Sequence, residues 1–234
     1  MKKLIIGFDV NEVLRSFIDR FDFYYEKEFK NNNLDPKNEH GFKFLEKYVF
    51  NPSVEINNIL HPNVNKDDVY VEKVKLTPEQ VFNKFLYEDY TFEIFGGASA
   101  VDRNTFTELN LLYKEYKDIY DFKIVVNENE KARAKTLFFL SKYDLQIPQI
   151  IFVDNEKEIW KNVDIYVTAN PNYLNNHPID KIIIKYKRDF NSSIFIDFTV
   201  KKIRTIQNIL KNKNKLYKLW FVGKILELFK FLNL

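Results

Sequence analysis

One carboxylate of the chain stands where an α/β protein would place a reactive group. Residues 3–10, Lys-Leu-Ile-Ile-Gly-Phe-Asp-Val, are largely apolar, which predicts a buried parallel strand followed by a helix over residues 13–29. Asp9 lies at the end of this strand. Ligands of open α/β sheets bind at the carboxyl ends of the strands, so Asp9 is placed to act as a nucleophile or a cation ligand. An equally simple interpretation is that Asp9 caps the following turn.

The composition excludes most other chemistries. The 234 residues include no Cys, five Gly and three His. Without Cys there are no disulfides, thiolate zinc sites or Cys nucleophiles, and we expect a reducing, cytoplasmic location. The spacing of the His and Gly residues is incompatible with HExxH, GxGxxG, a P-loop or GxSxG. Any metal site would therefore be built from oxygen ligands.

Helices and strands are expected to alternate along the second half of the chain. Capping boxes at Thr77–Gln80 and Thr105–Glu108 predict the starts of two helices. Beyond them, the sequence predicts strands at 122–126, 150–153, 163–167 and 181–186, with helices at 128–142 and 156–161. This alternation predicts an α/β fold with a parallel sheet covered by helices on both faces.

Two segments depart from the alternation. Residues 30–76 are interrupted repeatedly by Asn and Pro and indicate an insertion with short elements. Residues 201–234 contain nine Lys or Arg and a single Glu, a net charge of +8, whereas the preceding residues sum to −5. Apolar spacing predicts two basic amphipathic helices there, joined near 212–214, and Gly223 argues against an unbroken second helix.

The pattern around Asp9 resembles a known family. The strand followed by FDVNEVL is similar to motif I of the haloacid dehalogenase-like superfamily, in which a strand runs into DxDxx[TV][LV]. Residues 123–127 lie where motif II is expected, and residues 150–170 resemble the ending found in deoxyribonucleotidase-like members. The resemblance extends over about residues 1–17 and 104–190.

This resemblance implies three parts. Residues 1–17 and 104–195 would form a Rossmann-like core, residues 18–103 a cap insertion of the C1 type, and residues 196–234 a basic amphipathic helical tail. The chemistry it implies is phosphoryl transfer through an aspartyl-phosphate. That reaction uses an Asp nucleophile that also binds Mg²⁺, a second carboxylate as general acid/base, a hydroxyl and a Lys for the phosphoryl oxygens, and late carboxylates for Mg²⁺.

Several of these groups are replaced here. Asp9 matches the nucleophile, but Asn11 stands at the acid/base position, and an amide can neither donate nor accept the required proton. The motif II hydroxyl falls at Val126 or Asn127, of which only Asn127 offers a comparable hydrogen bond.

The later motifs are also altered. Lys157 matches the motif III lysine, with Lys142 as an alternative. The late carboxylate pair aligns with Thr168-Ala169, so both expected Mg²⁺ ligands are missing. Asp154 would join Asp9 as a metal ligand only in a shifted register.

These departures favour a haloacid dehalogenase-like pseudoenzyme that acts as a structural or assembly subunit. Heavy use of Lys and Asn is typical of AT-rich genomes and is compatible with a bacteriophage virion. The alternative is a Mg²⁺-dependent phosphatase or 5′-nucleotidase that forms an aspartyl-phosphate on Asp9 with shifted acid/base and metal groups. We expect no cofactor in the first case and Mg²⁺ in the second.

Other protein subunits are the expected partners, through the cap and the tail. Aromatic residues of the cap form either its own core or a contact surface: Phe21, Phe23, Tyr24, Tyr25, Phe42, Phe44, Tyr48 and Phe50. The tail packs on the body, docks on another protein or, as the least favoured interpretation, meets nucleic acid or an anionic membrane. No uncharged apolar run reaches the roughly 18 residues of a transmembrane helix.

The remaining notable residues have structural interpretations. We interpret the acidic residues Asp144, Asp164 and Asp180 as caps or loop residues. We interpret Trp160 and Trp220 as packing residues and His177 as a surface residue. No role is assigned to His40 and His61.

Overall fold

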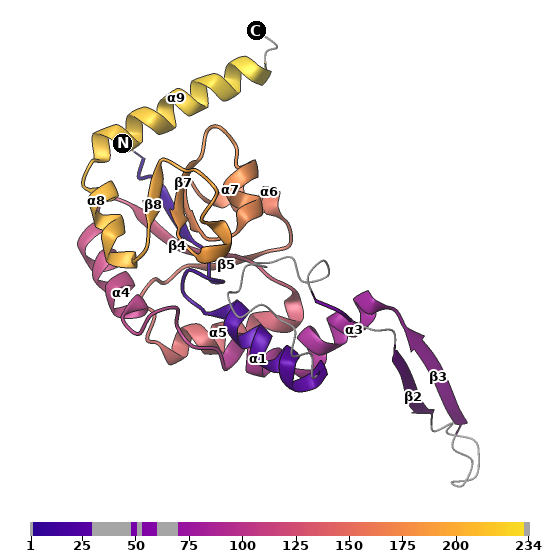
Figure 1. The fold of residues 1–234 in the computed structure, drawn as a ribbon. Helices are drawn as coiled ribbons and strands as arrows, with labels where there is room; N and C mark the ends of the chain where they lie inside the picture. Colours follow the sequence, from indigo (N-terminus) through magenta and orange to yellow (C-terminus); the bar gives the residue numbers. More distant parts are fainter. Residues whose placement is uncertain (1, 30–47, 51–52, 60–69, 232–234) are drawn as a thin grey trace.

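A six-stranded parallel sheet forms the body of the protein (Figure 1). The computed structural model describes residues 2–29, 48–50, 53–59 and 70–231. The strand order is β5-β4-β1-β6-β7-β8, and each neighbouring pair is parallel. The predicted α/β fold with a parallel sheet is confirmed. The strands are β1 (Ile5–Phe8), β4 (Asp121–Asn127), β5 (Ile150–Val153), β6 (Ile165–Thr168), β7 (Ile182–Tyr186) and β8 (Phe198–Val200).

Helices cover both faces of this sheet because successive strand residues point to opposite faces. In β4, Ile124 and Val126 belong to a core shared with α4, α5 and α8, whereas Val125 belongs to a second core with α6 and α7. Gly7 in the central strand has no room for a side chain, since a Cβ there would lie 2.3 Å from Cγ1 of Val163. The helices are α4 (Thr105–Tyr116), α5 (Glu130–Lys142), α6 (Glu156–Asn162), α7 (Pro171–Asn176) and α8 (Ile206–Leu210).

The insertion after β1 has an aromatic core of its own. It contains α1 (Phe17–Phe29), α3 (Pro78–Lys84) and two π-helical turns, η1 (Phe85–Asp89) and η2 (Phe92–Gly96). Ring contacts join its parts, for example Phe21 to Tyr48 with centroids 4.9 Å apart. Ala132 of α5 also belongs to this cluster, so the insertion packs on the body.

This aromatic core decides between the two interpretations of the cap aromatics where they are described. Phe21, Tyr25, Tyr48 and Phe50 are buried in the insertion and therefore cannot be surface anchors in this fold. Phe23 is 56% exposed and remains on the surface. Tyr24 is half-buried, and the predicted residues Phe42 and Phe44 lie outside the described residues.

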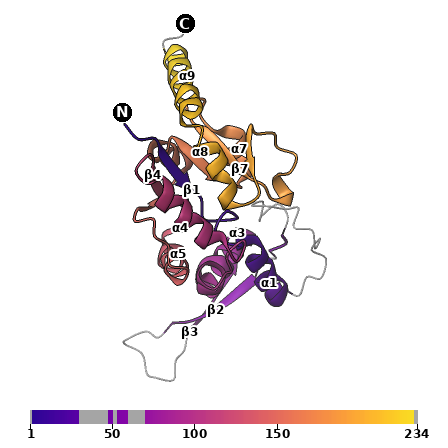
Figure 2. The ribbon, with the colours of Figure 1, turned by 90° about the vertical axis from the view of Figure 1, so that its left-hand side faces the viewer.

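A β-hairpin extends from the insertion away from the sheet and the helices (Figures 1 and 2). It consists of β2 (Ser53–Ile59) and β3 (Tyr70–Leu76), which pair antiparallel from Ser53↔Leu76 to Ile59↔Tyr70. The hairpin leads directly into α3. The predicted capping box of that helix is confirmed, because Thr77 and Gln80 exchange side-chain bonds with each other's backbone N–H groups.

Two helix starts differ from the prediction. The helix expected from residue 13 begins at Phe17, because the residues after β1 form a tight loop in which Glu12 has a positive φ of 63°. The helix at Thr105 begins as expected, but its predicted capping box is wrong. Asn104 is the N-cap residue, and Oγ1 of Thr105 instead accepts a bond from the backbone N–H of Asp102.

The C-terminal segment is integrated into the body more deeply than predicted. β8 extends the sheet beside β7, and the turn η4 (Ile203–Thr205) and α8 bury their apolar residues in the main core. What projects is a single helix, α9 (Lys213–Phe231), which lies beside the N-terminal segment (Figure 1). Gly223 does not interrupt it.

Candidate functional site

Asp9 lies directly after β1, at the carboxyl edge of the sheet, where the sequence places it. It is 6% exposed. Its Oδ1 accepts a hydrogen bond from the backbone N–H of Val10 at 2.9 Å, and its Oδ2 accepts one from Oγ1 of Thr168 at 2.8 Å. Burial raises the pKa of Asp9 to about 7, although these two bonds oppose the shift. The protonated form of this carboxyl is therefore favoured more than in an ordinary Asp.

The side chain of Arg15 connects the loop after β1 to other parts of the fold. Its side chain is fully buried and its Nη1 donates to the backbone oxygen of Phe95 at 2.9 Å and to Oγ1 of Thr136 at 2.7 Å. Its Nη2 forms an ion pair with Oε1 of Glu128 at 2.5 Å. The hydroxyl of Thr136 donates to the other oxygen of Glu128, which satisfies that carboxylate on both sides.

Aromatic rings complete the enclosure of this cation. The guanidinium carbon lies 5.0–5.7 Å from the ring centroids of Phe17, Phe95 and Phe139. These three rings come from α1, η2 and α5, so the contacts of Arg15 join the insertion to the body. A buried ion pair with all its hydrogen bonds made is costly to disrupt, because removal of one partner leaves the other charge unpaired.

Asn11 belongs to the same network. Its Oδ1 accepts hydrogen bonds from Nε of Arg15 at 3.0 Å and from Nη2 at 2.6 Å. The residue at the predicted acid/base position thus has its carbonyl oxygen bound to a buried cation. An amide has no titratable proton at ordinary pH, so this position cannot supply general acid/base catalysis.

The charged pair influences Asp9 directly. After burial and its two hydrogen bonds, the pKa of Asp9 is raised further by the Glu128 carboxylate and lowered by Arg15. Glu128 follows β4 in the loop before α5, whose N-cap is Asn129. A second carboxylate is therefore near Asp9, but Arg15 and Thr136 already occupy its oxygens.

Thr168 ends β6, and the sequence resemblance predicts the first late carboxylate at this residue. Besides donating to Asp9, its hydroxyl oxygen accepts the backbone N–H of Asn170 at 3.1 Å. A hydroxyl in this place supplies a hydrogen bond where a carboxylate would supply charge. The neighbouring Ala169 contributes only its backbone oxygen, which accepts a bond from Asn191.

Asn127 lies at the end of β4, the neighbour of β1 on the side opposite β6. Its side-chain nitrogen donates to the hydroxyl of Tyr173 at 3.3 Å, while Val126 is buried in the main core. Asn127 and Asp154 line one polar pocket of about 400 Å³ at this edge of the sheet. Of the predicted site residues, Asn11 and Asp9 thus share Arg15 as a neighbour. Asn127 and Asp154 line the same pocket.

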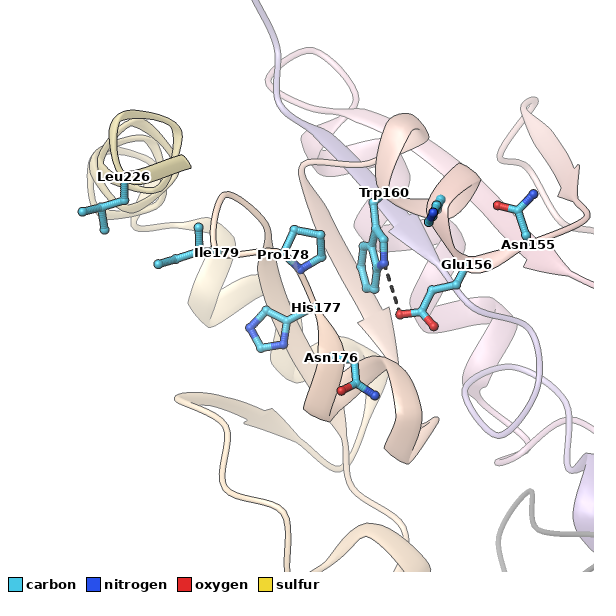
Figure 3. Close-up of a pocket in the computed structure, with 9 residues that line it drawn as sticks. Asn155, Glu156, Trp160, Asn176, His177, Pro178, Ile179 and Leu226 are labelled. Carbon is cyan, nitrogen blue, oxygen red and sulfur yellow. Dashed lines mark hydrogen bonds between the residues drawn. The ribbon is translucent and has the colours of Figure 1, made fainter. Parts of the chain in front are cut away.

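The predicted lysines lie elsewhere. Lys157 is exposed on α6 and lines a separate pocket of about 1060 Å³ between α6, the loop after α7 and α9 (Figure 3). In that pocket Nε1 of Trp160 donates to Glu156, and His177, Pro178 and Ile179 face the helix that carries Leu226 (Figure 3). Lys142, the alternative, is exposed and its ammonium group donates to the backbone oxygen of Ala98 at 3.5 Å.

The oxygen donors near Asp9 do not fit a Mg²⁺ ion. Asp154 is exposed and its carboxylate pairs with Arg133. Within the described ranges, no three His, Asp or Glu side chains are grouped so that they could hold a metal ion. Mg²⁺ requires near-octahedral oxygen ligation, usually with carboxylates supplying charge, whereas the two oxygens of Asp9 here accept hydrogen bonds from the Val10 N–H and the Thr168 hydroxyl.

Glu12 is a further buried carboxylate in this loop, and it was not singled out from the sequence. Glu12 is fully buried, its Oε1 accepts the backbone N–H of Ile18 at 2.8 Å, and its Oε2 lies 2.9 Å from Nη2 of Arg188. Burial raises the pKa of Glu12 to about 7, and Arg188 opposes this shift. The ion pair joins the loop after β1 to the segment after β7. One sequence signal marks Glu12, Arg15 and Glu128 as candidate buried charges. Each lies among apolar residues or close to the end of a strand.

Comparison with known proteins adds a limited similarity. No family model and no curated protein matches the sequence. Among solved structures, the chain is similar to a HAD-superfamily hydrolase of subfamily IA, variant 1, from Geobacter sulfurreducens PCA. The similarity covers 89% of this chain and 96% of the other, with 13% identity and a TM-score of 0.49. At this level it assigns neither an activity nor a substrate. Across the described residues, no helix is long and apolar enough to span a membrane.

Proposed function

We propose that this chain is a haloacid dehalogenase-like protein without phosphatase activity that serves as a structural or assembly subunit. The observation that carries this proposal is the double hydrogen bond from Arg15 to Asn11, at 2.6 and 3.0 Å. Asn11, at the position predicted for the acid/base group, is thereby part of a buried ion-pair network, and this network holds the insertion on the body.

The family assignment is supported by where Asp9 lies. β1 is a central strand between β4 and β6, and Asp9 follows it at the carboxyl edge. This is the position that the FDVNEVL segment suggests by its resemblance to motif I. The groups that would assist Asp9 in catalysis come from the ends of the two flanking strands, where Asn127 and Thr168 stand instead.

The charge balance around Asp9 argues against phosphoryl transfer. An aspartyl nucleophile must be ionised and needs positive charge to offset the phosphoryl oxygens. Here the neighbouring cation, Arg15, is already paired with Glu128. Lys157 is exposed in a different pocket and contributes nothing to this site.

An assembly role is supported by the projecting hairpin. An isolated two-stranded hairpin is marginally stable in water, and its open edges can accept further strands. β2 and β3 extend away from the remainder of the molecule (Figure 2), which favours a partner that covers them. The larger particle proposed is a bacteriophage virion, with which the Lys- and Asn-rich composition typical of AT-rich genomes is compatible.

The proposal is tested by a hydrolysis assay on the full chain. Purified protein is incubated with Mg²⁺ and either p-nitrophenyl phosphate or nucleoside monophosphates, beside an Asp9→Asn variant. We expect both proteins to release phosphate only at the background rate. Turnover by the wild-type protein that the Asp9→Asn substitution abolishes would establish a working aspartyl nucleophile and overturn the proposal.

A further inference from the structure

Helix α9 is held on the body by one face only. Leu216 is buried in the main core, and Nε1 of Trp220 donates to Oδ1 of Asp164 at 3.0 Å. One turn later, Nζ of Lys224 pairs with the buried carboxylate of Asp180 at 2.5 Å. Between these contacts Gly223 lies against the loop before β7, where a Cβ would lie 2.6 Å from the backbone oxygen of Ile179.

The opposite face of α9 is apolar and exposed. Leu216, Trp220 and Gly223 are spaced i, i+4, i+7 and define the inner face. A second series with the spacing i, i+4, i+7, i+8 lies on the other side of the helix. Its members are Phe221, Ile225, Leu228 and Phe229, with exposed fractions of 60%, 38%, 59% and 49%. We call these four residues the outer stripe of α9.

An apolar stripe that points away from the body needs a partner. A surface helix ordinarily presents polar residues to water, and a contiguous exposed apolar patch marks a protein or membrane contact. Val222, at 45% exposure, widens the outer stripe. Asp164 and Asp180, both loop residues, act as the anchors that orient this stripe outward.

Positive charge accompanies the outer stripe. Residues 201–234 carry a net charge of +8, and Lys213, Lys215 and Lys218 are exposed on the first turns of α9. The N-terminal segment adds Lys2, whose backbone oxygen accepts a bond from the hydroxyl of Tyr217 and whose side chain is exposed. Cationic residues thus lie on the helix that carries the outer stripe and on the N-terminal segment beside it.

We infer that α9 lies on the surface of an anionic lipid bilayer, with the outer stripe inserted among the lipids and the lysines near the headgroups. This inference goes beyond the proposed assembly role and does not depend on it. A helix with bulky apolar residues on one side and nearby Lys residues is the usual element of interfacial binding. Each Lys close to an anionic leaflet strengthens this binding further.

Charge and apolar surface together favour an anionic bilayer over two other partners, a second copy of the chain and nucleic acid. In a symmetric dimer through α9, a second copy of the chain would bring a second basic helix against the first, and the like charges would repel. Nucleic acid would attract the lysines but gives no reason for four exposed apolar side chains in a stripe. An anionic bilayer satisfies both the charge and the apolar surface.

The experiment is flotation of the full chain with vesicles. One set contains phosphatidylcholine alone and the other phosphatidylcholine mixed with phosphatidylglycerol. We expect binding to the anionic vesicles, weakened by added salt. The double variant Phe221→Ser/Phe229→Ser should lose this binding. The matched control is Leu111→Ser, which changes a residue that is 61% exposed on α4 and should bind like the wild type.

The charge contribution is measured with Lys218→Glu, which should weaken vesicle binding by about tenfold. Lys114→Glu, on the exposed surface of α4, is the control. Circular dichroism confirms that each variant is folded. Failure of the folded wild-type protein to bind anionic vesicles would overturn the inference. A dimer that light scattering detects and that depends on Phe221 and Phe229 would also overturn it. Binding to anionic vesicles that is unchanged in the Phe221→Ser/Phe229→Ser variant would overturn it as well.

Discussion

The side-chain oxygen of Asn11 accepts two hydrogen bonds from the guanidinium of Arg15, four residues later. The same guanidinium is paired with Glu128, 113 positions away in the sequence. A position that resembles a catalytic acid/base is therefore used to fix a buried cation between two parts of the fold. This relationship leads to a prediction about stability.

Replacing Arg15 with Met should destabilise the protein by about 3–5 kcal/mol, because Glu128 would remain buried without its cation. The free energy of unfolding, measured with urea, tests this. Lys131→Met is a suitable control, since Lys131 pairs with Glu88 at the surface and the loss of this exposed pair should cost less than about 1 kcal/mol. Equal effects of the two substitutions would contradict a dominant role for the buried pair.

Stability should also depend on pH through Asp9 and Glu12. Burial raises the pKa of each to about 7, whereas carboxyls of an unfolded chain titrate near 4. Between these values the folded state binds more protons than the unfolded state. The free energy of unfolding should therefore fall as the pH rises from about 4 to about 7.

An Asp9→Asn variant isolates one of these two contributions. Relative to the variant, the wild-type protein should lose roughly 2–4 kcal/mol of stability across this pH interval. Urea unfolding at several pH values measures the difference. Asp118→Asn, at an exposed residue, should leave the pH profile unchanged. Parallel profiles for the wild type and Asp9→Asn would show that the Asp9 carboxyl is not perturbed.

The close approach of α9 to the body predicts an unusual effect at Gly223. In an ordinary helix Gly→Ala stabilises by about 1 kcal/mol. Here the added Cβ would lie 2.6 Å from the oxygen of Ile179 and 2.8 Å from Cα of Asp180, so Gly223→Ala should destabilise by about 1–3 kcal/mol.

Hydrogen exchange of the α9 amides locates this effect. Exchange in α9 should accelerate in Gly223→Ala, whereas the sheet should change little. Val222→Ala changes the adjacent exposed residue and should alter stability by no more than about 0.5 kcal/mol. An Ala variant that is more stable than the wild type would mean that α9 does not rest on this loop.

Local patterns in the sequence were sufficient for the sheet and its flanking helices. The strand at 150–153 coincides with β5, and Asp9 ends a buried strand as expected. These elements are governed by runs of apolar residues and by caps that lie within a few positions. Helical spacing likewise indicates the segment 203–210, and its burial in the main core agrees with the interpretation in which the tail packs on the body.

Long-range pairing explains what the sequence did not reveal. Nothing near Arg15 indicates that its partners are Thr136 and Glu128, more than a hundred residues away. The positive φ of Glu12, which delays the start of α1, depends on contacts that include Arg188. Helical spacing in α9 indicated an apolar face but could not show that a second apolar face already rests on the body.

The central claim is that the surroundings of Asp9 hold hydrogen-bond donors and a satisfied ion pair in place of a Mg²⁺ site. Calorimetric titration of Mg²⁺ into the full chain tests this claim most directly, with Asp9→Asn as the matched variant. We expect no saturable binding that distinguishes the two proteins. A saturable Mg²⁺ isotherm in the wild type that disappears in Asp9→Asn would contradict the claim.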